Sequence, residues 1–309
     1  MNPLRTDASV VSLGDGMQVR RALPTAGRHQ IGAWCFLDHF GPVDVARTRG
    51  MRVGPHPHIG LQTVTWLLRG ELLHRDSLGT VQPIEPGALN LMTAGRGISH
   101  SEESPERRSA EIHGVQLWIA LPESARRMAP AFEHHPQVPV VRPNRARVSV
   151  FAGELLGERS QAKIHTPLVG ASIDVPAGSI ITIPVRPDFE HGVVVTYGRA
   201  EIAGQRIIPG ALVYLGPGRT GLPIVTGAGD AGIVLVGGEP LGESVLMWWN
   251  FVARTKDELT HASRDWNDGA EYLGDVRGYD GPRLVAPMPP WATRHPGDAD
   301  HASARDPVS

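Results

Sequence analysis

The 309-residue sequence contains one cysteine, Cys35, and no long uninterrupted hydrophobic run. A single cysteine excludes an intramolecular disulfide, and its apolar surroundings in residues 34–37 predict a buried structural thiol. No segment approaches the ~18 consecutive apolar residues of a transmembrane helix, so we expect no membrane association. The N-terminus also lacks the apolar core of a secretory signal. These absences together predict a cytoplasmic protein.

The sequence also lacks an excess of charge of either sign. It has 30 Lys and Arg residues against 32 Asp and Glu residues, which gives a formal net charge of −2. Such a balance provides no electrostatic basis for general nucleic-acid binding. A chain of this length, 41% of it hydrophobic, can bury the cores of two domains.

Glycine and proline, by contrast, are frequent, with 36 and 27 residues, and they separate short apolar runs such as residues 62–68 and 179–183. This rhythm predicts an all-β protein built as an antiparallel sandwich or barrel. The motif Ile-Glu-Pro-Gly-Ala-Leu at residues 84–89 recurs as Ile-Ile-Pro-Gly-Ala-Leu at residues 207–212. The repeat indicates two similar β domains in tandem.

We place the join within the proline-containing stretch 136–146, which predicts one domain over residues 1–140 and a second over residues 141–270. Thr255 and Glu258 have the spacing of a capping box, so a short helix is expected from there to about Trp266, at the end of the second domain. Residues 285–309 are rich in Pro, Ala, Asp and His, a composition typical of a disordered tail.

Two pairs of residues could carry chemistry. His56 and His58 are two positions apart, and on a strand this spacing puts both imidazoles on one face, where they could bind one ion. Taken alone, such a pair is more often two surface or turn histidines. His100 and Glu102 repeat the spacing, and two such strands side by side would direct four donors to one point.

Three neutral imidazoles and one carboxylate would leave a divalent ion with two open positions if its geometry is octahedral. Open positions indicate a reactive centre. Structural zinc normally takes four thiolate or imidazole ligands, and this chain has a single cysteine. The set accepts iron, manganese, nickel, copper or zinc.

The first pair resembles the first motif of the cupins, which is a glycine, five residues, His-x-His, a glutamate and a later glycine. Gly50, His56, His58 and Gly70 have this spacing, but Thr63 stands where cupins usually have the glutamate. Residues 95–100 resemble the second cupin motif, with glycine in place of its proline. The resemblance implies that Glu102 supplies the missing carboxylate.

This variation is similar to that of the pirins, and the resemblance extends over residues 36–42, 56–60, 74–77 and 93–102. It is close in the N-terminal half of the chain and loose in the C-terminal half. It implies two tandem cupin domains, which are β-barrels of the jelly-roll type. It also implies one metal ion per chain, iron(II) in the first instance, with His56, His58, His100 and Glu102 as ligands.

Aligning the repeats places Pro184, Arg186 and Pro223 where the first domain has histidines, and none of them can replace an imidazole. The second domain is therefore expected to lack an equivalent metal site and to support the first by packing. His165 and His191 are expected to be structural or surface residues.

Two further expectations concern the surroundings of the ligands. Val64, Trp66 and Leu68 would share the ligand face if the strand continued from His58 without a bulge, and would then line an apolar pocket or simply form barrel core. For His74, a hydrogen bond within its own loop is expected, with a position beside the ligands as the alternative.

The resemblance to pirins implies a dioxygenase that cleaves quercetin-like flavonols, with a small aromatic substrate and dioxygen as its partners. Glu102 would act as the catalytic base on the flavonol hydroxyl. The alternative from the same family is a non-enzymatic regulator that binds a protein partner according to the redox state of its metal. A cupin isomerase or an inactive metal-binding relative is a third interpretation. We expect a monomer.

Overall fold

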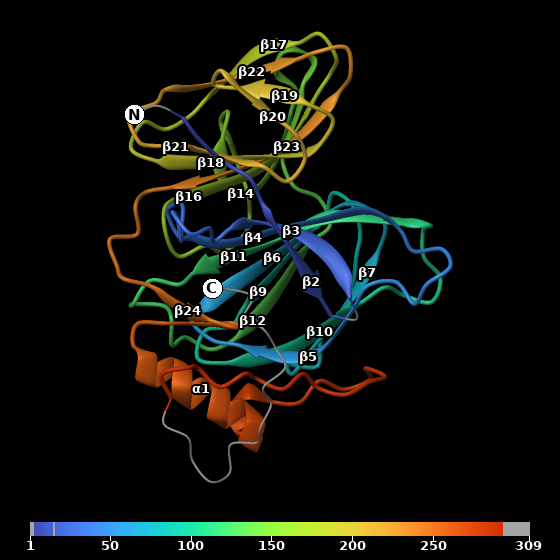
Figure 1. Ribbon diagram of the computed structural model, residues 1–309, viewed down its shortest axis with the longest axis vertical. Coiled ribbons are helices and arrows are strands. Elements are labelled where there is room, and N and C mark those ends of the chain that lie inside the picture. The colour runs from blue at the N-terminus through green and yellow to red at the C-terminus, as the bar shows by residue number, and fades with distance from the viewer. Residues whose placement is uncertain (1–2, 15, 293–309) are drawn as a thin grey trace.

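The computed structural model describes residues 3–14 and 16–292. Strands dominate, and they form two barrels stacked along the long axis of the molecule, with the second barrel uppermost in Figure 1. The predicted all-β fold with two barrel domains and a short helix near the C-terminal end is confirmed. Among the described residues, no helix is long and apolar enough to cross a membrane.

The first barrel consists of a seven-stranded and a four-stranded sheet. The larger sheet has the order β12-β9-β6-β11-β4-β3-β2 and the smaller one β5-β10-β7-β8. The strands of the larger sheet are β2 (Ser9–Leu13), β3 (Met17–Leu23), β4 (Trp34–Asp44), β6 (Leu61–Arg69), β9 (Leu89–Thr93), β11 (Glu111–Ala120) and β12 (Ala131–His135). Those of the smaller sheet are β5 (Arg52–His58), β7 (Leu72–Asp76), β8 (Val81–Ile84) and β10 (Ile98–Glu103).

The second barrel repeats this plan, with the order β1-β21-β18-β23-β16-β14-β13 in one sheet and β17-β22-β19-β20 in the other. The first of these sheets contains β1 (Leu4–Thr6), β13 (Val140–Val141), β14 (Arg147–Leu155) with its partner β15 (Glu158–Arg159), β16 (Leu168–Val175), β18 (Glu190–Tyr197), β21 (Leu212–Leu215) and β23 (Ala231–Gly238). The second contains β17 (Ile180–Pro184), β19 (Ala200–Ile202), β20 (Gln205–Ile207) and β22 (Gly221–Thr226). A short 3-10 helix, η1 (Pro143–Arg145), precedes β14.

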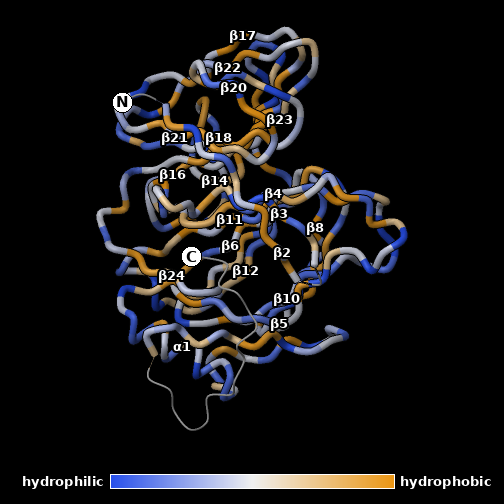
Figure 2. The backbone as a smooth tube through the Cα atoms, in the orientation of Figure 1, coloured by the Kyte–Doolittle hydropathy of each residue, from blue (hydrophilic) through white to orange (hydrophobic). Residues whose placement is uncertain are grey.

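The two barrels pack their larger sheets against each other through a shared hydrophobic core. Phe151 of the second barrel lies 6.3 Å from Trp34 and 5.1 Å from Trp66 of the first, measured between ring centroids. The indole N–H of Trp34 donates to the carbonyl oxygens of Val169 and Gly237, both at 3.1 Å. Figure 2 shows hydrophobic residues running along these central strands, whereas the outer loops are largely hydrophilic.

Two segments cross the predicted division at residue 140. β1 pairs with β21 of the second barrel, although its residues precede the whole first barrel. The hairpin of β24 (Leu246–Trp248) and β25 (Phe251–Ala253) bridges to the first barrel through Ile59 and Phe251. The helix α1 (Lys256–Asp268) and the 3-10 helix η2 (Glu271–Leu273) follow and pack with this hairpin below the first barrel (Figure 1). The predicted boundaries of 1–140 and 141–270 therefore do not describe these two segments.

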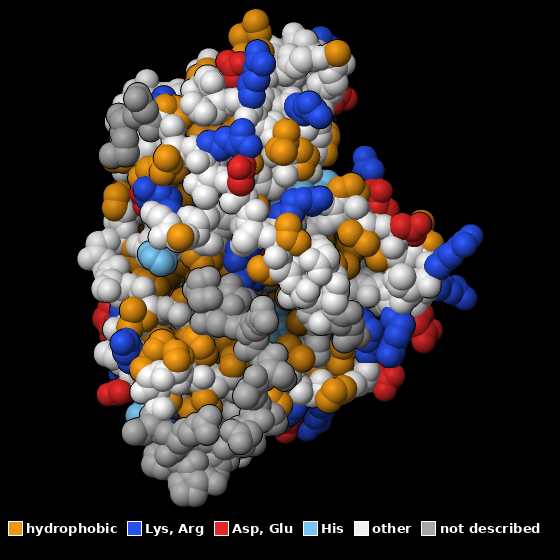
Figure 3. Space-filling model, in the orientation of Figure 1, with side chains coloured by type: hydrophobic (Ala, Val, Ile, Leu, Met, Phe, Trp, Pro, Cys, Tyr) orange, Lys and Arg blue, Asp and Glu red, His pale blue; other side chains and the backbone are white. Residues whose placement is uncertain are grey.

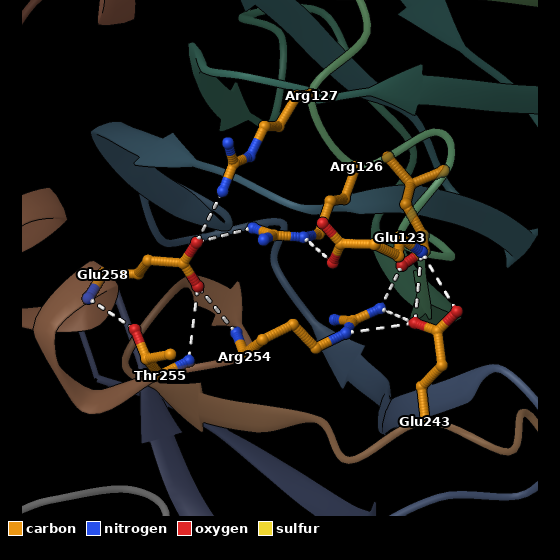
Figure 4. Close-up of polar contacts among 8 residues, drawn as sticks. Glu123, Arg126, Arg127, Glu243, Arg254, Thr255 and Glu258 are labelled. Carbon is orange, nitrogen blue, oxygen red and sulfur yellow. Dashed lines mark hydrogen bonds and ion pairs between the residues drawn. The ribbon is translucent and has the colours of Figure 1, made fainter.

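The helix predicted from Thr255 is confirmed. The Thr255 hydroxyl accepts from the backbone N–H of Glu258 at 3.2 Å, and the Glu258 carboxylate accepts from the backbone N–H of Thr255, which completes the capping box. Glu258 also accepts hydrogen bonds from Arg126 and Arg127, which belong to a loop of the first barrel (Figure 4). One carboxylate therefore caps the helix and anchors it to the barrel.

Replacing Glu258 with glutamine is expected to lower the free energy of unfolding by about 1–2 kcal/mol at pH 7. Although partial burial opposes ionisation, the N–H of Arg254 and the guanidinium of Arg126 lower the pKa of Glu258 to about 2. The stabilisation is present above the usual pKa of a glutamate and is lost as the pH falls towards 2. Urea unfolding at pH 7 and pH 3 should show a smaller difference at pH 3. Glu271→Gln, at an exposed position, is the control.

The first residues of the segment predicted to be a disordered tail pack against the rest of the protein, contrary to expectation. Trp291 packs against Trp248, with a centroid distance of 5.4 Å, and its indole N–H donates to the backbone of Lys256. Residues 285–292 therefore lie against the helix, whereas 293–309 are outside the described residues. On the face shown in Figure 3, basic and acidic side chains are interspersed over both barrels.

Candidate metal centre

The four predicted ligands lie on two neighbouring antiparallel strands. His56 on β5 is directly opposite His100 on β10, and His58 lies two residues further along β5 on the same face. The register shifts between His100 and Glu102, so a bulge separates these two residues. All four side chains are buried, with at most 6% of their surface exposed. The structure thus brings together the residues that the spacing predicted.

Hydrogen bonds to backbone carbonyls fix two of the three imidazoles. His56 donates through Nδ1 to the carbonyl oxygen of Gly54 at 2.8 Å, and His58 donates through Nδ1 to that of Asn250 at 2.9 Å. A carbonyl oxygen can only accept, so Nδ1 carries the proton in both rings. The Nε2 atom of each neutral ring is then left with a free lone pair.

His74 fixes the third imidazole in the same way. In the neutral ring, donation from Nε2 to the carboxylate of Asp76 at 3.0 Å leaves Nδ1 as an acceptor 3.4 Å from Nδ1 of His100. The Asp76 carboxylate is itself held by the backbone N–H groups of Leu78 and Thr80. His100 is therefore protonated on Nδ1, and its Nε2 also presents a lone pair.

These tautomers bring two lone pairs into close contact. Nε2 of His58 and Nε2 of His100 are 3.0 Å apart, and with both Nδ1 atoms protonated neither can donate to the other. A cation between them removes the repulsion. Two ligands of one ion at about 2.1 Å and at a right angle would be about 3.0 Å apart, so the residues present fit a metal ion.

Burial keeps the imidazoles in the neutral form that a metal requires. It lowers the pKa of His56 to about 4, although the hydrogen bond to Gly54 opposes the shift. It likewise lowers the pKa values of His58 and His100 well below the ordinary value, and the neighbouring histidines add to the effect. At neutral pH, therefore, protons do not compete for these nitrogens.

Glu102 adds an oxygen donor on the same strand. Its Oε1 accepts a hydrogen bond from the hydroxyl of Thr65 at 2.9 Å, and the same hydroxyl lies 2.9 Å from the side-chain oxygen of Gln116. Burial raises the pKa of the Glu102 carboxyl, while His74 and Thr65 act in the opposite direction. The hydrogen bond from Thr65 occupies one carboxylate oxygen and leaves the other free for a ligand.

Two overlapping donor groups occur among the described residues, one of His56, His58 and His100 and another of His74, His100 and Glu102. Within each group the donor atoms lie within 4.8 Å of one another. The cavity beside them is lined by His56, His58, His100 and Glu102 but not by His74. Open space for an ion and a second ligand therefore lies on the side of the four predicted residues.

That cavity has a volume of about 180 Å³ and an aromatic wall. The rings of Phe36 and Trp118 stack at 4.0 Å with an interplanar angle of 12°. Arg21 holds both oxygens of Asp38 at 2.9 Å in a buried ion pair, and its guanidinium lies 4.6 Å from the centre of the Phe36 ring. Trp249 also lines the cavity. The wall is suited to a flat aromatic molecule.

The sequence left two interpretations for Val64, Trp66 and Leu68, pocket lining or core; the pocket interpretation is wrong and the core interpretation is confirmed. Val64 and Trp66 lie in the core between the barrels, with Leu68 packed against it. The reason is a sharp turn at Gly60, which separates β5 from β6 and has a φ of +69°. A Cβ atom on Gly60 would lie 2.1 Å from the carbonyl oxygen of Val252. The turn reverses the alternation, so Thr65 instead faces the ligands.

Other sequence expectations have simple outcomes. His74 bonds Asp76 on its own strand, β7, where a bond within a loop was expected, and it also contacts His100, as the alternative predicted. Cys35 is a buried free thiol, as predicted, and burial raises its pKa to about 12. Two histidines outside these expectations, His39 and His113, pair with each other through their Nε2 atoms at 2.9 Å, and neither lines the ligands' cavity.

Comparison with known proteins identifies the family. Residues 16–119 match the family model described as Pirin, and residues 170–271 match that of the pirin C-terminal cupin domain. The chain belongs to the pirin family. A pirin-like protein of Caulobacter vibrioides is 33% identical over 277 residues, which cover 87% of this chain and 94% of that protein.

Two relatives with a higher sequence identity have names that refer to an enzyme. A Pseudomonas aeruginosa protein named "Putative quercetin 2,3-dioxygenase PA1205" is 45% identical over 288 residues, covering 93% of this chain and 90% of its own. The crystal structure of a quercetin 2,3-dioxygenase from Acinetobacter baumannii has a TM-score of 0.91 to this chain, with 42% sequence identity. The match covers 95% of this chain and 97% of that structure. Pirins of this kind are therefore bicupins with the same architecture over nearly their full length.

Proposed function

We propose that this pirin is a metal-dependent dioxygenase that acts on quercetin-like flavonols or a related aromatic substrate. The metal ligands would be His56, His58, His100 and Glu102, with one divalent ion per chain. Iron(II) is the ion that resemblance to pirins implies, and the donor set also accepts manganese, nickel, copper or zinc. The observation that carries the proposal is the 3.0 Å distance between Nε2 of His58 and Nε2 of His100, beside a cavity with an aromatic wall.

The residues of the cavity suit this chemistry. A bound divalent ion would supply a Lewis acid and, if redox-active, a route for electrons to dioxygen. Phe36 and Trp118 offer a flat surface along which an aromatic ring can enter. At about 180 Å³ the cavity is smaller than the roughly 300 Å³ or more of typical ligand sites, which favours insertion of one ring of the substrate.

Glu102 is the proposed base. Its carboxylate faces the cavity, and the hydroxyl of Thr65 bonds one of its oxygens. The other oxygen can take the proton of a flavonol hydroxyl that enters the cavity, since a base must lie within hydrogen-bond distance of that proton. The buried surroundings exclude bulk water from this transfer.

The proposal is tested by mixing iron-loaded protein with quercetin in air and following the flavonol absorbance beside a metal-free control. Loss of absorbance that requires the metal supports the enzyme. Metal analysis of protein purified without added metal identifies the ion, and a chain that binds no metal under any condition would contradict the ligand assignment. The predicted monomer and cytoplasmic location remain expectations.

The alternative is a redox-sensing regulator with a protein partner. No turnover over a panel of flavonols, together with a partner that binds only one oxidation state of the iron-loaded protein, would favour it. The same four ligands would serve both functions, so metal binding by itself does not separate them.

Replacing His74 with phenylalanine is expected to weaken metal binding by about 10–100-fold, because His100 loses the acceptor that fixes its tautomer. Phenylalanine keeps the stacking of this side chain on Phe132, whose ring lies 4.4 Å away. A competition titration against a chelator measures the affinity. Phe132→Leu is the control for packing, and an equal loss in that variant would contradict the hydrogen-bond explanation.

A further inference from the structure

The second barrel contains a cavity that is larger than the one at the metal centre. Its volume is about 640 Å³, within the roughly 300–1,000 Å³ of small-molecule sites. It is formed by the ends of β14 and β17, the starts of β16 and β18, and residues 164–167. These strands lie in the upper barrel of Figure 1, away from β5 and β10.

The position of this cavity corresponds to that of the metal centre. The strand order β17-β22-β19-β20 repeats β5-β10-β7-β8, so β17 is the counterpart of the histidine-bearing β5. Pro184 at the end of β17 and Arg186 just beyond it line the cavity, and neither is a metal ligand. The barrel has thus kept a cavity at this end with a different lining.

The lining contains two buried polar groups without partners. His191 is 1% exposed, and neither of its ring nitrogens has a hydrogen-bond partner among the described residues. The hydroxyl of Thr166 is likewise buried and unpartnered within this part of the chain. Leaving such a group unpaired is unfavourable, and in native proteins nearly all of them bond to protein, ligand or ordered water.

The charges and walls of the cavity favour an uncharged ligand. Arg186 is in ion pairs with Asp188 and Glu239, and Arg159 is paired with Glu154 at 2.6 Å. Apolar side chains make up much of the remaining lining, among them Leu155, Val169, Val185 and Phe189. A charged ligand would have to separate an existing ion pair, whereas an apolar molecule would not.

His191 further limits the chemistry of the ligand. Burial lowers the pKa of its imidazole to about 4, with Asp188 opposing and Arg219 adding to the shift. The neutral ring therefore has one N–H donor and one nitrogen acceptor at pH 7, and the hydroxyl of Thr166 can also donate or accept. A ligand hydroxyl matches both groups, since it can donate and accept at once.

We propose that the cavity of the second barrel binds a small, uncharged, mainly apolar molecule with a hydroxyl group, which is recognised by His191 and Thr166. This site is separate from the metal centre and does not depend on the proposed dioxygenase activity. It gives the second barrel a role in binding, beyond the packing role that its lack of predicted ligands implied.

Methyl NMR of the full-length chain titrated with 2-naphthol tests the proposal. Shift changes at the methyl groups of Leu155, Val169 and Val185 are expected. Changes confined to Val53 and Leu284, which line the metal-centre cavity, would overturn it, as would no change at all. 2-Methylnaphthalene, which lacks the hydroxyl, should bind about 5–10-fold more weakly, and equal binding would contradict recognition of the hydroxyl.

Two variants locate the site. His191→Phe keeps a ring of similar shape and should weaken 2-naphthol binding by about 5–10-fold. Val185→Trp fills the partly buried mouth and should abolish the shifts, with folding checked by circular dichroism. His261→Phe, on an exposed part of α1, is the matched control. Unchanged affinity in both folded cavity variants would overturn the proposal, whatever the outcome of the quercetin assay.

Discussion

Replacing His100 with alanine is expected to lower metal affinity by more than about 100-fold and to abolish metal-dependent turnover of quercetin. This loss should exceed the 10–100-fold that removal of an outer hydrogen-bond partner typically costs. His100 is the ring that both donor groups share, with Nε2 3.0 Å from His58 and Nδ1 3.4 Å from His74. Its removal therefore takes away a ligand and breaks the chain of hydrogen bonds that begins at Asp76.

Metal content after dialysis and the rise in melting temperature on adding iron(II) or zinc measure this effect. A ligand that binds only the folded state stabilises it by about 2.7 kcal/mol at one hundred times its dissociation constant, so the wild type should melt higher with metal. His100→Ala should lose that response. His134→Ala is the control, because this histidine belongs to the same barrel but bonds Asn90 away from the cavity. Retention of tightly bound metal by His100→Ala would refute the assigned centre.

The sequence predicted that the four candidate ligands lie close together, because the information for this is local. Two residues at positions i and i+2 of a strand share a face whatever the rest of the fold does, so both pairs could be recognised from spacing. The hydrogen-bond partners that orient these side chains could not be recognised from spacing. The carbonyl that fixes His58 belongs to Asn250, 192 residues away, on a segment that reaches back from the end of the second barrel.

The fold shows the same division between local and long-range information. The recurring Pro-Gly-Ala-Leu motif predicted two barrels, and the capping-box spacing predicted the helix, since both depend on residues close together in sequence. Two other features could not be predicted, because they depend on partners far away in sequence. Strand β1 pairs with β21 of the second barrel, and the hairpin of β24 and β25 contacts the first barrel. The turn at Gly60 has a local signal, the glycine two residues after His58, but a glycine at this point is also compatible with a strand that continues.

In the proposed function, catalysis depends most directly on Glu102. Glu102→Gln keeps the size of the side chain and an oxygen that can bind metal, but it removes the proposed base. We expect partial retention of metal and a loss of turnover of about 10²–10⁴-fold, the range that a general base contributes. Oxygen uptake with quercetin, normalised to bound metal, separates this effect from simple loss of the ion.

Two further variants define how Glu102 acts. Thr65→Val removes the hydroxyl that bonds Oε1 of Glu102 and also contacts Gln116, and it should reduce turnover by about 10-fold, because the carboxylate loses its orientation but not its charge. Glu103→Gln changes the adjacent residue on β10, whose carboxylate instead pairs with Arg52 and Arg75, and should leave turnover unchanged. Full oxygen uptake by Glu102→Gln would rule out the base role while leaving the ligand set intact. In that case the substrate hydroxyl would have to lose its proton to solvent, and the buried carboxylate would serve only to balance the charge of the ion.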